Sequence, residues 1–241
     1  MKQILSTGLS AIALALAAGS VHAQVTNGGF NGLAGWSTSG DAASIGGNHL
    51  VLTNALDGGD DADGVNRNVS GNAPTPAAGD LENFVGIAPG ALDVDAANGV
   101  QAMEGSAALQ TFTAAAGSRL TFQWNLATTE TSTDPSVADI AFIVIDGQLI
   151  TLANTLAATS ATGGGDYATQ TGWTDWSTTL ASGGTHTIAF GIIDEGQWID
   201  TSALSVSDVG VASSVPESSG LAMLAAGLGL LGVQARRRRK A

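Results

Sequence analysis

The sequence contains no cysteine, which excludes disulfide bonds, thiol catalysis and thiolate metal sites. It is also poor in charge, since only 12% of its residues are charged. Between residues 24 and 214 the only basic side chains are Arg67 and Arg119, against twenty acidic ones. Nucleic acid is therefore not an expected partner, because electrostatic binding to phosphates needs a cationic face. The acidic surface favours solubility outside the cell and also attracts divalent cations.

The first 23 residues have the pattern of a secretory signal peptide. Lys2 supplies a positive charge, residues 4–18 are apolar, and Val21-His22-Ala23 ends in small residues. We expect a signal peptidase to cleave before Gln24. A membrane-spanning or buried helix is the alternative interpretation, but the run is short for a span and has the wrong flanks.

The last 27 residues have the pattern of a second targeting signal. A short polar motif comes first, an apolar run follows at residues 220–233, and a basic cluster ends the chain. A helix of fourteen residues would be roughly 21 Å long, which is less than a full hydrocarbon core of about 30 Å. Its position predicts a transient anchor in the inner membrane, with the basic end held on the cytoplasmic side. The motif comprises Val215, Pro216, Glu217 and Ser218, and the basic tail comprises Arg236, Arg237, Arg238, Arg239 and Lys240.

This three-part tail resembles the PEP-CTERM sorting signal of Gram-negative bacteria. The resemblance implies recognition by an exosortase, which would cut near Pro216-Glu217 and release or transfer the body to the cell surface or extracellular matrix. Proteins with this signal are typical of bacteria that make exopolysaccharide and biofilm. Ser218 stands where the family has a second proline. This departure bears on how efficiently an exosortase would process the motif, and not on the identity of the signal. The expected organisation is a signal peptide (1–23), a β-sandwich domain (24–211), a linker with the sorting motif (212–219), an anchor helix (220–233) and a basic tail (234–241).

The body between these signals predicts an all-β fold, an antiparallel, jelly-roll-like β-sandwich. Residues 119–126 alternate between apolar and polar, which is typical of a strand with one buried face. Residues 138–145 are almost continuously apolar, as in a strand covered on both sides, and Asp146-Gly147 after them predicts a tight hairpin turn. Residues 54–105 have little periodicity, and we expect short strands and loops there at one end of the sandwich. The expected strands are 49–53, 107–113, 119–126, 138–145, 148–152, 185–193 and 203–211.

The body also resembles galactose-binding-like and other carbohydrate-binding jelly rolls. Asn27-Gly28-Gly29-Phe30, followed by Trp36, is similar to their first strand, and residues 202–209 are similar to their last. In those families a structural calcium often lies between these strands. The resemblance carries one calcium ligand over to this sequence, Asp208, whereas Asn31 replaces the usual glutamate.

A second candidate calcium site lies in an acidic, glycine-rich segment at residues 57–64. Asp and Gly together supply oxygen ligands and a backbone that folds tightly, which calcium needs. The spacing does not match an EF-hand loop, and a solvated acidic turn is the alternative. The carboxylates are Asp57, Asp60, Asp61 and Asp63.

The five tryptophans include two in the segment Gly-Trp-Thr-Asp-Trp. Trp173 and Trp176, with Asp175 between them, are candidate sugar-binding residues, because an aromatic face packs on a pyranose ring while a carboxylate bonds a hydroxyl. In a strand the two tryptophans point to opposite faces, so at most one is a platform. A role in closing the sandwich is the alternative for both. Trp124 is expected in the core.

No motif of a hydrolase or metalloprotease occurs, and the protein is not expected to be an enzyme. For glycoside hydrolysis the candidate carboxylates are the pair Asp194-Glu195 together with Asp200, although adjacent carboxylates at a strand end are usually turn residues. The function expected from the sequence is that of a non-catalytic, exported surface or matrix protein that binds exopolysaccharide. A structural surface protein without a ligand, an ice-binding protein and a glycoside hydrolase remain as alternatives.

Overall fold

The structure is a computed structural model that describes residues 24–56, 58, 63–93, 99–162, 166–196 and 198–213, with Gly227, Leu228 and Arg236 from the tail. Among these described residues, thirteen strands form two antiparallel sheets, so the prediction of an antiparallel β-sandwich is confirmed. The strands are β1 (Ser37–Ser39), β2 (Asp41–Ile45), β3 (His49–Thr53), β4 (Thr75–Pro76), β5 (Ala102–Ala114), β6 (Arg119–Thr128), β7 (Ile140–Ile145), β8 (Gln148–Asn154), β9 (Ser160–Ala161), β10 (Thr169–Gln170), β11 (Thr174–Thr179), β12 (Gly184–Glu195) and β13 (Ser202–Ala212). Short helical turns are η1 (Ala77–Leu81), α1 (Glu82–Val85), η3 (Pro135–Val137) and η4 (Thr155–Ala157).

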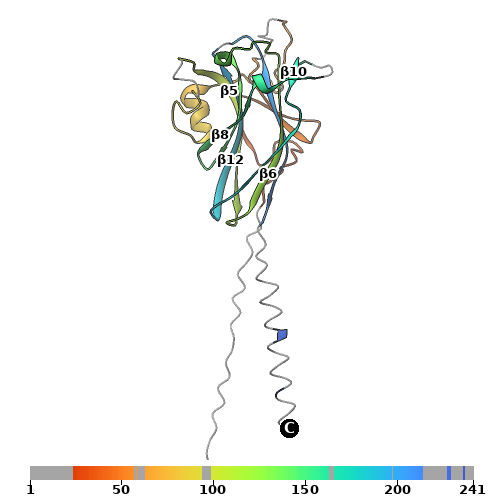
Figure 1. The fold of residues 1–241 in the computed structure, drawn as a ribbon, viewed down its shortest axis with the longest axis vertical. Helices are drawn as coiled ribbons and strands as arrows, with labels where there is room; N and C mark the ends of the chain where they lie inside the picture. The colour runs from red at the N-terminus through yellow and green to blue at the C-terminus, as the bar shows by residue number, and fades with distance from the viewer. Residues whose placement is uncertain are drawn as a thin grey trace, which may run out of the picture.

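The six-stranded sheet has the order β1-β5-β12-β7-β8, with β4 also pairing with β5. The seven-stranded sheet has the order β2-β3-β13-β6-β10-β9, with β11 also pairing with β6. In Figure 1 the two sheets face each other, with β5, β12 and β8 in one layer and β6 and β10 in the other. The main core fills the space between them.

The alternation predicted for β6 is confirmed. Leu120, Phe122, Trp124 and Leu126 are all buried and belong to the core between the sheets. Trp124 is therefore a core residue, as the sequence indicates. The positions between them, Thr121, Gln123 and Asn125, face away from the core, because side chains alternate along a strand.

A second apolar cluster covers the outer face of the six-stranded sheet. Phe142 and Val144 of β7 belong to it, whereas Ile143 and Ile145 belong to the main core. The prediction that this strand is covered on both sides is confirmed. The cover is the segment that contains η1 and α1, with Leu81 and Val85 buried. Figure 1 places these helical turns, in yellow, beside β5 and β8 and on the side opposite β6.

The tight turn after β7 is also confirmed. Asp146 and Gly147 both have positive φ angles, 50° and 79°, which is the geometry of a two-residue hairpin that joins β7 to β8. The Asp146 carboxylate accepts hydrogen bonds from the Thr187 backbone N–H at 2.9 Å and lies 2.7 Å from Nδ1 of the buried His186. These contacts fasten the hairpin to β12.

Three expectations from the sequence need correction. The segment 54–105 does not lie only at one end of the sandwich, because its helical turns cover a sheet face with apolar side chains. Asn27–Phe30 forms a turn and not a first strand, although Phe30 is fully buried and the Val209 N–H donates to the Gly28 carbonyl. The sequence analysis also missed β1, β2 and β11, whose residues are mostly small or polar. Within the part of the chain that the structure describes, no helix is long and apolar enough to cross a membrane.

Candidate functional site

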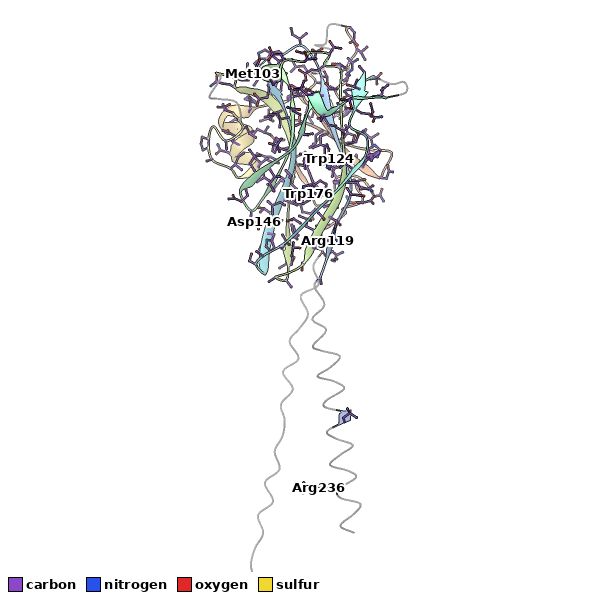
Figure 2. The ribbon with its side chains drawn as sticks, viewed as in Figure 1. Met103, Arg119, Trp124, Asp146, Trp176 and Arg236 are labelled. Carbon is purple, nitrogen blue, oxygen red and sulfur yellow. The ribbon has the colours of Figure 1, made fainter. Side chains whose placement is uncertain are left out.

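The outer face of the seven-stranded sheet, which we call the open face, carries polar side chains along β6. Arg119 is exposed at the start of the strand, and Thr121, Gln123 and Asn125 follow on the same face. Figure 2 shows Arg119 near one end of the body and Trp124 further along the same strand. Two hollows lie on this face. One includes Gln123 and the other Asn125, so they lie on either side of the position of Trp124 along β6.

An exposed aromatic residue stands on the open face. Trp173 is 51% exposed and directly precedes β11, where Thr174 pairs with Trp124 of β6. Its indole meets the imidazole of His49 of β3 edge to face, with ring centroids 6.0 Å apart. In the sheet, β13 and β6 separate β3 from β11. The two rings therefore reach toward each other across these two strands. His49 is further held by Asn48, whose Oδ1 lies 2.8 Å from Nδ1.

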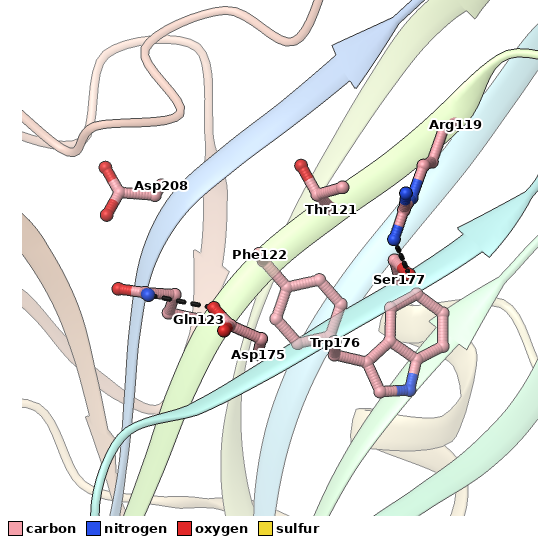
Figure 3. Close-up of a pocket in the computed structure, with 8 residues that line it drawn as sticks. All are labelled: Arg119, Thr121, Phe122, Gln123, Asp175, Trp176, Ser177 and Asp208. Atoms are coloured by element: carbon pink, nitrogen blue, oxygen red, sulfur yellow. Dashed lines mark hydrogen bonds between the residues drawn. The ribbon is translucent and has the colours of Figure 1, made fainter.

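The first hollow, which we call the β11 hollow, has a volume of about 350 Å³. Gln123 donates a hydrogen bond from Nε2 to Oδ1 of Asp175 at 2.9 Å, and Asp208 lies beside this pair on the neighbouring strand (Figure 3). Asp208 has a positive φ of 53° at the bulge of β13, between Ser207 and Gly210. The hollow is lined by Arg119, Thr121, Phe122, Gln123, Asp175, Trp176, Ser177 and Asp208.

The second hollow, which we call the Arg67 hollow, has a volume of about 490 Å³. Its floor includes Asn125, Ala127 and Ser205, and amide side chains are linked across it. Asn125 donates from Nδ2 to Oε1 of Gln170 at 2.9 Å, and Thr171 donates to Oδ1 of Asn125 at 3.2 Å. The remaining lining residues are Ile45, Val51, Asn66, Arg67, Asn68, Val69, Thr162, Asp166, Tyr167, Gln170 and Ala203.

Arg67 braces the wall of this hollow. Its guanidinium donates to both carboxylate oxygens of Asp63, at 2.9 and 2.6 Å, and Nε donates to the Asp166 carbonyl at 2.5 Å. The same guanidinium lies 5.8 Å from the centroid of the Tyr167 ring. The side-chain hydrogen bonds from Arg67 lower the pKa of Asp63 to about 2. Two loops distant in sequence, 63–68 and 166–170, are joined by this one buried side chain.

Asp41 fixes the base of the first of these loops. Its buried carboxylate accepts hydrogen bonds from the backbone N–H groups of Val69 at 2.9 Å and Ser70 at 2.7 Å. It also accepts from the hydroxyls of Ser70 and Thr53. Four donors around one carboxylate hold the loop against the edge of the seven-stranded sheet, because each bond to an ionised group is stronger than a neutral one.

The structure separates the two candidate tryptophans. Trp176 stacks on Phe122, with ring centroids 4.8 Å apart, and packs against the core. Trp173 faces the other way and is exposed. The expectation that the two point to opposite faces is confirmed, and Trp173 is the one with an exposed ring. Asp175, the third candidate, lines the β11 hollow.

The candidate calcium ligands do not come together in the described part of the chain. Asp57, Asp60 and Asp61 lie outside the described residues. Asp63 is paired with Arg67, and Asp208 lies in the β11 hollow. Among the residues that the structure describes, no group of three or more His, Asp or Glu side chains is arranged to hold a metal ion.

Buried carboxylates gather at the end of the sandwich where β6, β12 and β13 meet their loops. Asp139 accepts hydrogen bonds from Asn54 Nδ2 at 2.9 Å and from the Glu195 N–H at 3.2 Å. Burial, reinforced by the charge of Glu130, raises the pKa of Asp139 well above its ordinary value. The pair Asp194-Glu195 is only 2% exposed at each residue. This pair, which the sequence suggests for glycoside hydrolysis, is therefore buried and does not lie on the open face.

The two targeting signals are not tested by the described residues. Residues 1–23, the sorting motif Val215–Ser218 and the basic residues Arg237, Arg238, Arg239 and Lys240 lie outside them. Arg236 is described, and it is exposed.

The sequence analysis missed several residues of the open face, among them His49, Gln170 and Tyr167. The polar phase of β6 did contain a signal, since Gln123 and Asn125 occupy the outward positions of its alternation. Arg67 was also distinctive, as one of two arginines in an acidic body. What the sequence could not show is that the loop 63–68, about fifty residues before the start of β6, lies against the same face.

A scan against protein-family models finds no match, and neither does a comparison with curated proteins. Among solved structures, a family 61 carbohydrate-binding module in complex with β-1,4-galactotriose is 11% identical, covers 79% of this chain and 97% of its own, and has a TM-score of 0.36. A family 4 carbohydrate-binding module is 14% identical, with coverage of 75% and 95% and a TM-score of 0.32. The N-terminal cellulose-binding domain of β-1,4-glucanase C from Cellulomonas fimi is 12% identical, with coverage of 76% and 90% and a TM-score of 0.29. At these values the likeness concerns the β-sandwich architecture alone.

Proposed function

We propose that this protein is an exported, non-catalytic protein that binds polysaccharide on the open face of its seven-stranded sheet. The observation that carries the proposal is the exposed ring of Trp173 on the open face, with one hollow on each side of it along β6. The apolar face of a sugar ring packs on an indole, and carboxylate and amide side chains bond its hydroxyl groups. The Gln123–Asp175 and Asn125–Gln170 pairs supply such groups on either side of the ring.

The same proposal takes the protein to the cell surface or extracellular matrix of a Gram-negative bacterium. A signal peptidase removes residues 1–23, the C-terminal helix holds the precursor in the inner membrane, and an exosortase acts at the sorting motif. Mass spectrometry of the mature protein's termini tests this step. We expect a first residue of Gln24 and a last residue near Pro216; a protein that retains Lys2 or the basic tail contradicts it.

Catalysis is not part of the proposed function. The pair Asp194-Glu195 is buried, and Asp175 is held by Gln123 in the β11 hollow. Incubation of the protein with the polymer it binds, followed by an assay for new reducing ends, tests this point. Steady release that Asp175→Asn abolishes would replace the proposal with a glycoside hydrolase.

Binding itself is tested by co-sedimentation of the purified full-length protein with insoluble exopolysaccharide from the producing bacterium. We expect saturable binding that Trp173→Ala weakens at least about tenfold, as for a buried aromatic anchor of an interface. Trp198→Ala is the matched control, because Trp198 is 49% exposed but lies in the loop between β12 and β13, and not beside β6 and β11. Equal loss in both variants, or no binding by the wild type, contradicts the proposal.

The proposed calcium ligands in the segment 57–63 are tested in the same assay with added calcium and with chelator. Because this segment leads into the loop that carries Arg67, bound calcium would stiffen one wall of the Arg67 hollow. We expect weaker binding in chelator. Identical isotherms in both conditions contradict a role for calcium.

A further inference from the structure

We propose that the two hollows are parts of one binding site for an extended, uncharged polysaccharide chain that follows β6 and crosses Trp173 between them. The inference rests on the proposed function and adds to it the charge class of the ligand and its course over the protein. Three observations carry it: the position of the hollows along β6, the position of Trp173 between them, and the charges that line them.

The hollows lie in line along one strand. The β11 hollow takes Arg119, Thr121 and Gln123 from β6, and the Arg67 hollow takes Asn125 and Ala127. These are successive outward positions of the same strand. At about 3.4 Å per residue, the stretch from Thr121 to Ala127 spans roughly 20 Å, which is room for several sugar rings in a row.

Trp173 stands at the boundary between the hollows. Trp124 of β6 pairs with Thr174 on one side and with Val206 on the other, and Val206 pairs with Leu50. Trp173 and His49 are the residues directly before Thr174 and Leu50. Their rings meet over the row of Trp124, which separates Gln123 from Asn125. A chain that occupies both hollows must therefore pass over the exposed indole.

The charges on this face disfavour an anionic polymer. Asp175 and Asp208 line the β11 hollow, and Asp166 lines the Arg67 hollow. Arg67 is paired with Asp63 through two hydrogen bonds. Arg119 donates to the Ser177 hydroxyl at 2.8 Å and is the one cation that lines the β11 hollow, against two carboxylates. A uronate or sulfate polymer would bring negative charge to a face on which carboxylates outnumber the cations that could offset it. Amides donate to hydroxyl groups and accept from them, and carboxylates accept from them, without any such cost.

The charge class is tested by affinity electrophoresis of the full-length protein in gels that contain one polymer each. The probes are β-glucan, galactan, mannan and xylan as neutral polymers, alginate as the anionic one and chitosan as the cationic one. We expect retardation by at least one neutral polymer, weakened by Trp173→Ala, and none by alginate. Retardation by alginate at equal strength, or by chitosan alone, overturns the inference while leaving glycan binding in place. If no polymer retards the protein, the proposed function itself fails.

The course of the chain is tested by calorimetry with oligosaccharides of three to eight residues from the polymer that binds. Gln123→Ala alters only the β11 hollow, and Gln170→Ala only the Arg67 hollow. Gln148→Ala is the matched control, because Gln148 is exposed on β8 of the other sheet. We expect both hollow variants to weaken binding of the octasaccharide about fivefold, the value of roughly one hydrogen bond, and the control to leave it unchanged. The trisaccharide, which is too short for both hollows, responds to only one variant. If only one hollow variant affects the octasaccharide, the inference is overturned.

Discussion

The outer faces of the two sheets differ in what lies on them. The outer face of the six-stranded sheet is closed by η1 and α1, which bury Leu81 and Val85 against Phe142 and Val144. The open face of the seven-stranded sheet has no such apolar cover among the described residues. It carries Gln123, Asn125 and an exposed Trp173 instead. One outer face is thus packed against an apolar cover, and the other leaves exposed the side chains to which the proposed function assigns the ligand.

The difference is already present in the side-chain pattern of two central strands. β7 reads Ile-Ala-Phe-Ile-Val-Ile, with every residue buried, because each of its faces meets a core. β6 alternates, so that one face meets the core and the other meets solvent. A central strand that keeps polar residues on one side leaves that side of the sheet facing solvent.

The largest expected effect comes from breaking the covered face. Phe142→Ala removes a ring that is 1% exposed, and we expect unfolding free energy to fall by about 3 to 5 kcal/mol. Gln123→Ala on the open face should change it by less than about 0.5 kcal/mol, as for an ordinary surface substitution. Denaturant titration of both variants measures the contrast. Equal destabilisation would contradict the division between the two faces.

A smaller loss of stability is expected when a side-chain atom is added to the packed outer face of the six-stranded sheet. Gly191 of β12 lies against the Phe142 ring, and a Cβ at this position would overlap ring atoms. Gly191→Ala should therefore cost about 1 to 3 kcal/mol, because a packed core resists added volume. Thermal unfolding measures it, with Gly29→Ala as the control, since nothing lies within 4 Å of a Cβ there. An unchanged melting temperature for Gly191→Ala would show that the cover is loosely packed.

Acid should loosen the covered face before it affects the open one. Glu82 of α1 accepts hydrogen bonds from the backbone N–H groups of Gly79 and Leu92, each at 3.0 Å. Burial acts to raise the pKa of Glu82, but the hydrogen bonds outweigh it and hold this pKa below the ordinary value. The stabilisation is complete above the unfolded-state pKa of about 4.3 and is lost as the pH falls through the lower folded pKa.

Melting temperatures from pH 7 to pH 3 test this sign. Glu82→Gln should lower the melting temperature at pH 7 and depend less on pH below about 5 than the wild type. If the melting temperature of the variant falls with acid as steeply as that of the wild type, Glu82 does not contribute to the acid sensitivity.

The smallest effect on stability is expected from loss of the Asp63–Arg67 ion pair beside the open face. Asp63→Asn removes the carboxylate that holds Arg67 but touches neither core cluster. We expect an unchanged melting temperature and weaker binding of a neutral polymer, because one wall of the Arg67 hollow loses its support. Calorimetry and thermal unfolding on the same preparation separate the two. A stability loss with full binding would assign Asp63 a purely structural role.

The sequence predicted the sandwich because periodicity reports burial directly. The alternation of β6, the unbroken apolar run of β7 and the turn at Asp146-Gly147 each have a local physical cause. The cover of the six-stranded sheet was not predictable in this way, since Leu81 and Val85 lie in a segment with little periodicity. Trp173 was predictable as a candidate, whereas its partner His49 was not, because their contact depends on strand order.

The most direct test uses the two exposed tryptophans of the wild-type protein as internal controls. Trp173 and Trp198 are 51% and 49% exposed, so a tryptophan-oxidising reagent should modify both at similar rates in the free protein. Mass spectrometry of peptides then reports each site in the presence of a bound neutral oligosaccharide. The account predicts that the ligand protects Trp173 and leaves Trp198 reactive. Protection of Trp198 alone, or of neither residue under saturating ligand, would contradict binding on the open face.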